Sequence, residues 1–293
     1  MSNDNHVEAV KKVFEYINEN IDKKMSLQEI AKVSGYSSWH ISRIFKQHYN
    51  KSIFSFIRSL RLSKAALHLR DNESNVLDVA LDFMFDSHEG FTRAFAKEFR
   101  INPKRYSKDT PPIKLFIPYP INHKTNKEDN VLDHETIVIF SQVIEKPKRK
   151  AIIKRAITAR EYFKYCEEVG SDVWGTLCSI KEALFEPAGM WLHKSIINEG
   201  TSKYVQGVEV PFDYNGIVPE GFEIIDLDAC KAMIFQDPQY DDADFLVAVG
   251  KVMKEIDKYD PTSFGFEWAD DLSPRFQYQP RGERGYIEGR AVK

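Results

Sequence analysis

Two arginines, Arg43 and Arg93, each follow a serine by six residues in segments that match at a constant offset of 50. The segments read SSWHISRIFK from Ser37 and SHEGFTRAFAK from Ser87. A serine hydroxyl caps a helix by accepting from its first free N–H groups, so each arginine is expected on an exposed face near a helix start. A guanidinium held there can contact the edges of bases or, alternatively, a backbone phosphate. The repeat therefore predicts two arginines that read DNA.

A helix and a short turn must precede each serine-led segment to hold it in place. Ser26 and Glu29 form a capping-box signature for the first of these helices, and Gly35 supplies the tight turn after it. The pair Ile30-Ala31 recurs as Val79-Ala80, at an offset one residue shorter than that of the serines. The second turn is therefore expected to carry one extra residue, and the whole pattern predicts a tandem helix-turn-helix.

Other helices are expected to frame the two copies. Apolar residues recur every three or four positions over 7–21, which predicts an amphipathic helix. A longer helix should link the copies as a rigid spacer, because two recognition helices reach successive major-groove turns only when held about 34 Å apart or when the DNA bends. Asn102-Pro103 is expected to end the last helix. The apolar stripe predicted for the linking helix comprises Phe54, Ile57, Leu60, Leu62, Ala65, Ala66 and Leu69, and the buried row of the second copy comprises Phe91, Phe95 and Phe99.

Length and charge favour two domains with different tasks. A chain of 293 residues exceeds the usual size of one core. Residues 1–110 hold 18 Lys and Arg against 14 Asp and Glu, a net +4, whereas the remainder holds 23 against 30, a net −7. A basic half beside an acidic half fits a DNA reader joined to a domain that does not bind DNA.

Neither a signal peptide nor a run of about 18 apolar residues is apparent, so we expect a cytoplasmic protein without a membrane partner. The three cysteines lack CxxC spacing and are interpreted as reduced, mostly buried thiols.

The segments GYSSWHISRIFK, RLSKAALHL, FDSHEGFTRAFAKEF and NPKRY closely resemble the DNA-binding signature of the AraC/XylS family of bacterial transcription regulators. The resemblance spans residues 8–107 and implies an all-α domain with two helix-turn-helix motifs. The order, with this domain first and a larger one after it, is similar to Rob-type members. Double-stranded promoter DNA and, for an activator, RNA polymerase are the partners that the resemblance implies.

The resemblance also implies which side chains contact DNA. The base-contacting residues of the family fall on Trp39, Ser42, Arg43, His88, Glu89, Gly90 and Arg93. Contacts to backbone phosphates are expected from Lys46, Arg58, Lys97 and Arg105. Relatives carry glutamine where this chain has Glu89, and a glutamate only accepts hydrogen bonds, which favours cytosine N4.

A proline-rich stretch over 108–130 is interpreted as a linker, and residues 131–293 as an α+β domain of two similar halves. Strands are predicted over 135–146, 148–157, 202–212, 222–236 and 285–293, and helices over 159–184 and 243–259. The fold class is thus multidomain, with an all-α tandem helix-turn-helix domain followed by an α+β domain.

The second domain resembles the gyrase-inhibitor-like (GyrI-like) effector-binding domain. The resemblance rests on GMWLHKS from Gly189, YVQGVEVP from Tyr204, the run from Asp226 to Gln236 and the late GYIE. It implies a small-molecule pocket between two halves, with an acidic residue and aromatic walls suited to lipophilic, often cationic ligands. The residues that match this pattern are Glu288, with Glu209 as a second choice for the acid, and Trp191, Trp268, Tyr204 and Tyr278 for the walls.

The sequence thus favours a DNA-binding transcription regulator, an activator, controlled by a small molecule. One alternative is a regulator whose second domain serves only for oligomerisation or for a protein partner. A hydrolase is the less favoured alternative, because neither a nucleophile–base pair, nor HExxH, nor a phosphate-binding glycine loop is recognisable. No catalytic residue, metal site or cofactor is expected.

Overall fold

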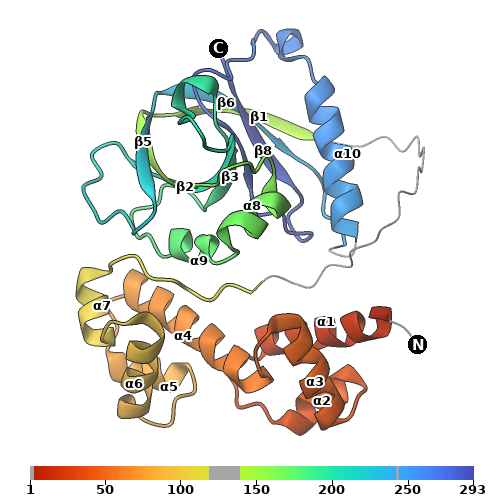
Figure 1. Ribbon diagram of the computed structural model, residues 1–293, viewed down its shortest axis with the longest axis vertical. Coiled ribbons are helices and arrows are strands. Elements are labelled where there is room, and N and C mark those ends of the chain that lie inside the picture. The colour runs from red at the N-terminus through yellow and green to blue at the C-terminus, as the bar shows by residue number, and fades with distance from the viewer. Residues whose placement is uncertain (1–2, 119–138, 242–243) are drawn as a thin grey trace. The chain divides into compact units, whose positions relative to one another are not determined.

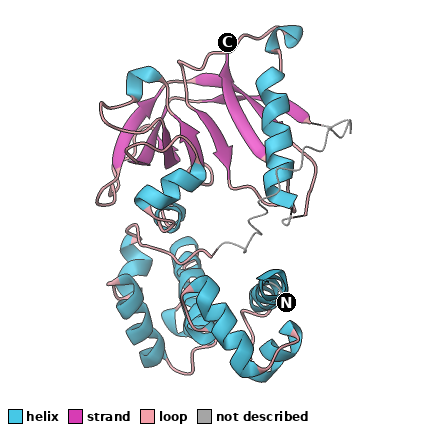
Figure 2. Cartoon of the chain, turned by 45° about the vertical axis from the view of Figure 1, so that its right-hand side comes forward, coloured by secondary structure: helices cyan, strands magenta, loops and turns pink. Residues whose placement is uncertain are grey.

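The computed structural model describes residues 3–118, 139–241 and 244–293, and the chain divides into two compact units, residues 1–126 and 127–293. The first unit is helical and the second is built on a sheet (Figures 1 and 2). The expected order of a helical domain followed by a sheet-rich domain is therefore confirmed. Among the described helices, none has the length and apolar character needed to cross a membrane.

The helical unit contains two helix-turn-helix motifs, α2–α3 and α5–α6, joined by the long helix α4. Helices α3 and α6 have equal length and begin 50 residues apart, whereas α2 and α5 begin 49 apart. The second motif therefore has one extra residue before its second helix, with a turn over 83–87 against 35–37 and a shorter α5. The helices are α1 (Asn3–Glu19), α2 (Leu27–Ser34), α3 (Ser38–Tyr49), α4 (Ile53–Asp71), α5 (Val76–Asp82), α6 (His88–Phe99) and α7 (Pro103–Asp109).

Side-chain caps set the helix boundaries as expected. The Ser26 hydroxyl accepts from the Glu29 amide, and the Glu29 carboxylate accepts from the Ser26 amide at 2.7 Å. Gly35 then turns the chain at φ 72°. Met84 occupies the matching place in the second motif at φ 62°, a left-handed conformation that is uncommon for residues other than glycine.

Helix α4 supports both motifs through its buried face, and the predicted row Phe91, Phe95 and Phe99 is buried beside it. One prediction was wrong. Phe54, assigned to the apolar stripe, is 49% exposed. Ile53, Phe56, Ile57 and Leu60 already face the core at helical spacing, which leaves Phe54 off that face.

The end of the helical unit differs from the expectation as well. Helix α6 ends before Asn102 as expected, but the Asn102 side chain then caps a further helix, α7, so Asn102-Pro103 does not end the last helix of the unit. Residues 113–116 return to the helical core, and we call them the strap. Ile113 and Leu115 are buried, and the Phe116 amide donates to the Ser63 hydroxyl at 2.7 Å. The strap lies at the start of the stretch predicted as a linker, of which 119–130 lies outside the described residues.

The sheet unit consists of an eight-stranded antiparallel sheet with helices on one face. The strand order is β1-β6-β8-β7-β3-β4-β2-β5. The strands are β1 (Phe140–Lys146), β2 (Arg149–Arg155), β3 (Ala188–Trp191), β4 (Tyr204–Pro211), β5 (Glu223–Leu227), β6 (Cys230–Gln236), β7 (Arg275–Tyr278) and β8 (Ile287–Val292). The helices are α8 (Tyr162–Val169), α9 (Val173–Cys178) and α10 (Phe245–Lys258), with short 3-10 turns at Lys194–Ile196 and Pro261–Phe264.

The sheet repeats one arrangement twice, in agreement with the prediction of two similar halves. Strands β2, β4 and β3 pair in that spatial order, with α8 and α9 between β2 and β3 in the chain. Strands β6, β8 and β7 pair in the same order, with α10 between β6 and β7. The halves meet where β3 pairs with β7, so the centre of the sheet is the boundary between them.

Each half buries its own cluster on the helix-covered face. Helices α8 and α9 pack with Tyr204 and Val208 of β4, whereas α10 packs with Met233 and Phe235 of β6. A separate cluster, which includes Val205, lies on the other face, where the sheet curls (Figure 1). We call the strip of β3, β7 and β8 between the two helical layers the seam.

Several element boundaries in this unit differ from the predictions. The helix predicted over 159–184 is two short helices, because Gly170 adopts φ 98° and breaks the first of them. The strand predicted over 222–236 is two separate strands, because β5 pairs with β2 at one edge of the sheet whereas β6 pairs with β1 and β8 in the other half. Strands β3 and β7 were not predicted, since four residues give too little alternation to detect. Residues 135–138 of the first predicted strand lie outside the described residues.

Candidate nucleic-acid interface and effector site

Helix α3 presents its first turns to solvent. The Ser37 hydroxyl accepts from the His40 amide, which fixes the helix start. Trp39 is 71% exposed, and the Arg43 guanidinium carbon lies 5.2 Å from its ring centroid. Ser42 donates its hydroxyl hydrogen to the Ser38 carbonyl at 2.7 Å, so its remaining capacity is that of an acceptor. A stacked arginine beside a serine acceptor can contact both acceptor and donor groups of base edges.

Helix α6 presents the equivalent turns of the second motif. The Ser87 hydroxyl accepts from the Gly90 amide at 3.1 Å, and His88, Glu89 and Arg93 are exposed. A Cβ at Gly90 would lie 3.1 Å from the Ser87 hydroxyl. The absence of a side chain at Gly90 therefore leaves room for the Ser87 hydroxyl to cap the helix, and Gly90 presents only backbone atoms to DNA.

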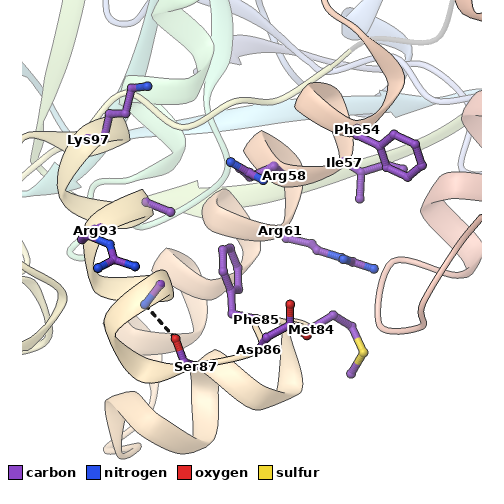
Figure 3. Close-up of a pocket in the computed structure, with 12 residues that line it drawn as sticks. Phe54, Ile57, Arg58, Arg61, Met84, Phe85, Asp86, Ser87, Arg93 and Lys97 are labelled. Atoms are coloured by element: carbon purple, nitrogen blue, oxygen red, sulfur yellow. Dashed lines mark hydrogen bonds between the residues drawn. The ribbon is translucent and has the colours of Figure 1, made fainter.

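A groove of about 560 Å³ lies between α4 and α6 (Figure 3). It brings together Arg58, Arg93 and Lys97, which the sequence assigned to DNA contacts on two different helices. Arg61 has another role, since its Nε donates to the Ile21 carbonyl at 2.8 Å and ties α4 to the turn after α1. The remaining lining residues are Phe54, Ile57, Met84, Phe85, Asp86, Ser87, Gly90 and Ala94.

The other two predicted phosphate contacts lie outside this groove. Lys46 is exposed in the last turn of α3. Arg105 is exposed on α7 and forms an ion pair with Asp109 at 3.2 Å. Phe54 also lines this groove. The sequence analysis did not assign Phe54 to a DNA-contacting surface, because its place in the predicted apolar stripe indicated burial.

In the sheet unit, Glu288 is a fully buried acid at the seam. Its carboxylate accepts from the Tyr286 hydroxyl at 2.8 Å and lies 2.6 Å from Arg275 Nε. Burial raises the pKa of the Glu288 carboxyl above its ordinary value, and Arg275 opposes that rise.

Register shows that Glu288 belongs to a polar row across the seam. Gln206 pairs with Gly189, Gly189 with Gln277, and Gln277 with Glu288. Directly paired residues of antiparallel strands point to the same face, so this row lies on the helix-covered face. Gln206 of β4 and Glu288 of β8 occupy equivalent positions of the two halves. Gln206 pairs with the second-last residue of β2, and Glu288 pairs with the second-last residue of β6.

Two predicted wall residues lie beside this row. Trp191 pairs with Tyr204, and their ring centroids are 5.2 Å apart. The Tyr204 hydroxyl lies 2.2 Å from where a Cβ of Gly189 would be, so only glycine leaves room for it. Trp268 is on the same face, under α10, with the Arg290 guanidinium carbon 3.9 Å from its ring centroid.

Glu209 and Tyr278 lie on the opposite face of the sheet from Glu288. The Glu209 carboxylate is 2.7 Å from Lys146 Nζ and 2.9 Å from Arg149 Nε, and all three residues are buried. Burial lowers the pKa of Lys146. The structure thus places Glu288 and Trp191 in the seam and Tyr204 beside it on β4, whereas Glu209 belongs to a buried ion cluster on the opposite face.

The structure adds one seam residue that the sequence did not suggest. Arg275 on β7 pairs in register with Trp191 and reaches Glu288 on β8. Arg275, Trp191 and Glu288 come together only because three short strands pair, and no local sequence pattern predicts that pairing. The three cysteines form no disulfide and are half-buried, rather than mostly buried as expected.

Comparison with known proteins places the helical unit in a family. A family model described as a helix-turn-helix domain matches residues 22–109. The transposon Tn10 TetD protein of Escherichia coli is 36% identical over 104 residues, which are 36% of this chain and 75% of TetD. Regulatory protein SoxS of Salmonella typhimurium is 35% identical over 101 residues, which are 34% of this chain and 94% of SoxS.

The transcriptional regulator Rob of Salmonella typhimurium is 40% identical over 103 residues, but this match covers 32% of the chain and only 36% of Rob. The similarity to SoxS and TetD, in contrast, spans most of each relative. Together with the two helix-turn-helix motifs, these matches show that the chain belongs to the AraC family of DNA-binding transcription regulators.

Proposed function

We propose that this chain is a transcription activator whose DNA binding is controlled by a small, lipophilic cation held in the sheet unit. In this proposal the sheet unit is a GyrI-like effector domain, and RNA polymerase is the partner at the promoter. One observation carries the effector role, which is the fully buried Glu288 carboxylate at the seam between two similar halves. Burying a carboxylate is costly, so such a group needs a cationic partner; the Arg275 side chain supplies it in this structure, and a cationic ligand could supply it instead.

We further propose that α3 and α6 read bases through Trp39, Ser42, Arg43, His88, Glu89, Gly90 and Arg93. Exposure of these helix starts supports the assignment, as does the stacking of Arg43 on Trp39. Lys46, Arg58, Lys97 and Arg105 would hold the phosphate backbone. The groove of Figure 3 supports a backbone path past α4, since it unites Arg58, Lys97 and Arg93.

The alternative, a sheet unit that only binds another protein chain, has an observation in its favour. Strand β1 forms one edge of the sheet, where Phe140 is 64% exposed, and β5 forms the other edge, where Ile224 is exposed. Open edges with apolar side chains can pair with further strands. Edge pairing would make the unit a dimerisation module that needs no ligand.

The effector is tested by screening lipophilic cations for a rise in melting temperature and measuring the best compound by calorimetry. Glu288→Gln keeps the shape of the side chain and removes its charge, so ligand affinity should fall at least about tenfold. Asp270→Asn is the matched control, because Asp270 pairs with Arg290 beside Trp268. Glu209→Gln should reduce stability rather than affinity, since Lys146 and Arg149 would lose their shared partner.

The same ligand should change the affinity of the full-length protein for its DNA site. If Glu288→Gln and Asp270→Asn bind the compound as wild type does, the cationic effector site is elsewhere or absent. Assembly that depends on protein concentration and is lost on Phe140→Lys, without any ligand, would support the dimerisation module instead.

A further inference from the structure

The seam already holds a planar cation, and it comes from the chain itself. Arg275 Nη2 donates to the Glu288 carboxylate at 2.9 Å, and Arg275 Nη1 donates to Asp257 of α10 at 2.8 Å. The guanidinium carbon lies 5.5 Å from the centroid of Trp191. The guanidinium thus contacts the buried Glu288 carboxylate, the face of Trp191 and the more exposed Asp257 carboxylate. Carboxylates and an aromatic face are the groups that recognise an organic cation.

Arg275 closes this site from the solvent side. Its side chain is 21% exposed, whereas that of Glu288 is fully buried. In the Glu209 cluster, by contrast, both cations and the acid are buried, and Arg149 also donates to the Ser273 hydroxyl. Arg275 can therefore turn outward without opening the sheet, because only side-chain contacts hold it.

Two polar atoms next to this site are buried without a hydrogen-bond partner in the described part of the chain. They are the Tyr204 hydroxyl and Oε1 of Gln206, on residues that are 0% and 1% exposed. Both residues flank Gly189 on the face that also carries Arg275 and Glu288. Buried polar atoms nearly always have partners, so a bound molecule that reaches across Gly189 would satisfy them.

We propose that Arg275 is a tethered occupant of the effector site, and that the effector carries a guanidinium- or amidinium-type cation that displaces it from between Trp191 and Glu288. The body of the effector then extends along the seam toward Tyr204 and Gln206. This inference rests on the proposed effector role of Glu288. It adds that the site is closed in the absence of ligand by a competing side chain, and it specifies a planar cation.

The test removes the tethered cation and supplies its head group in solution. Full-length Arg275→Ala is melted in increasing ethylguanidinium, with ethylammonium at the same ionic strength as the non-planar cation. A tethered competitor acts at an effective concentration of about millimolar or more. Arg275→Ala should therefore respond saturably at concentrations at least about tenfold lower than wild type, and respond less to ethylammonium.

Arg290→Ala is the matched control, because Arg290 also covers a tryptophan and pairs with an aspartate, Asp270. It should behave as wild type, and Arg275→Ala combined with Glu288→Gln should lose the response. Arg275→Gln replaces the alanine variant if that variant does not fold. Equal responses of wild type, Arg275→Ala and Arg290→Ala would overturn the proposal, as would no saturable response in any folded Arg275 variant.

No DNA is present in this measurement, which separates it from the test of the proposed function. If Arg275→Ala binds ethylguanidinium but no ligand changes the DNA affinity of the protein, the cation site at the seam is supported and control of DNA binding by an effector is refuted. If a ligand changes DNA affinity but Arg275→Ala shows no response to ethylguanidinium, effector control is supported and the proposal that Arg275 occupies the effector site is refuted.

Discussion

At the scale of single residues, the two groups of arginines in this protein differ in what surrounds them. Arg43 is exposed beside an exposed Trp39, an arrangement that leaves a large aromatic surface in water. Arg275 and Arg149 instead have buried carboxylate partners. A charge with a buried partner contributes to the fold or to a closed site, whereas an exposed stacked pair is available to a macromolecule.

Arg43→Ala should reduce affinity for a selected DNA site by about 1–3 kcal/mol and relax discrimination mainly in one half of that site. Arg58→Ala should weaken binding to specific and random duplexes alike, and should lower the slope of log affinity against log salt by about 1. Both variants are compared with wild type by fluorescence anisotropy on the two duplexes. Equal losses on both duplexes for Arg43→Ala would assign it to a phosphate.

At the scale of elements, the strap shows how a stretch rich in proline can belong to a folded core. Leu115 is 3% exposed, and the Phe116 ring meets Phe56 edge-on at 5.1 Å. The four prolines of the surrounding stretch suggested a linker, yet alternate residues of the strap are apolar and buried. Composition alone did not separate these residues from the stretch that follows.

Leu115→Ala should destabilise the helical unit by about 2–4 kcal/mol, because a buried leucine is lost. The neighbouring exposed Lys114→Ala should change stability by no more than about 0.5 kcal/mol. Denaturant unfolding followed by circular dichroism at 222 nm measures both variants. A Leu115→Ala protein as stable as Lys114→Ala would mean that the strap contributes nothing to the unit.

The same elements show what the sequence could predict. Caps at Ser26, Ser37 and Ser87 are local signals, and the structure contains all three. Most of the sheet was predicted from alternation in its longer strands. The seam was not, because Arg275, Trp191 and Glu288 meet only through the register of three separate strands. Local pattern carries no information on that register, and the aromatic residues of the resemblance therefore fell on both faces.

At the scale of the whole molecule, charge follows the division into units. The net charge of +4 over residues 1–110 accompanies the helix-turn-helix motifs, and the net charge of −7 belongs to residues 111–293, which include the sheet unit. A modest basic excess supplies a salt-dependent attraction to DNA, whereas base contacts must supply the preference for a sequence. The acidic unit is suited to attracting a cationic ligand.

The most direct test of the central claim is selection of bound sites from random duplex DNA by the full-length protein. Two recognition helices joined by α4 predict a bipartite site, with two preferred blocks spaced by about one helical turn and affinity that falls as salt rises. A protein that is folded by circular dichroism but retains random duplexes without enriching any sequence would contradict sequence-specific recognition by α3 and α6.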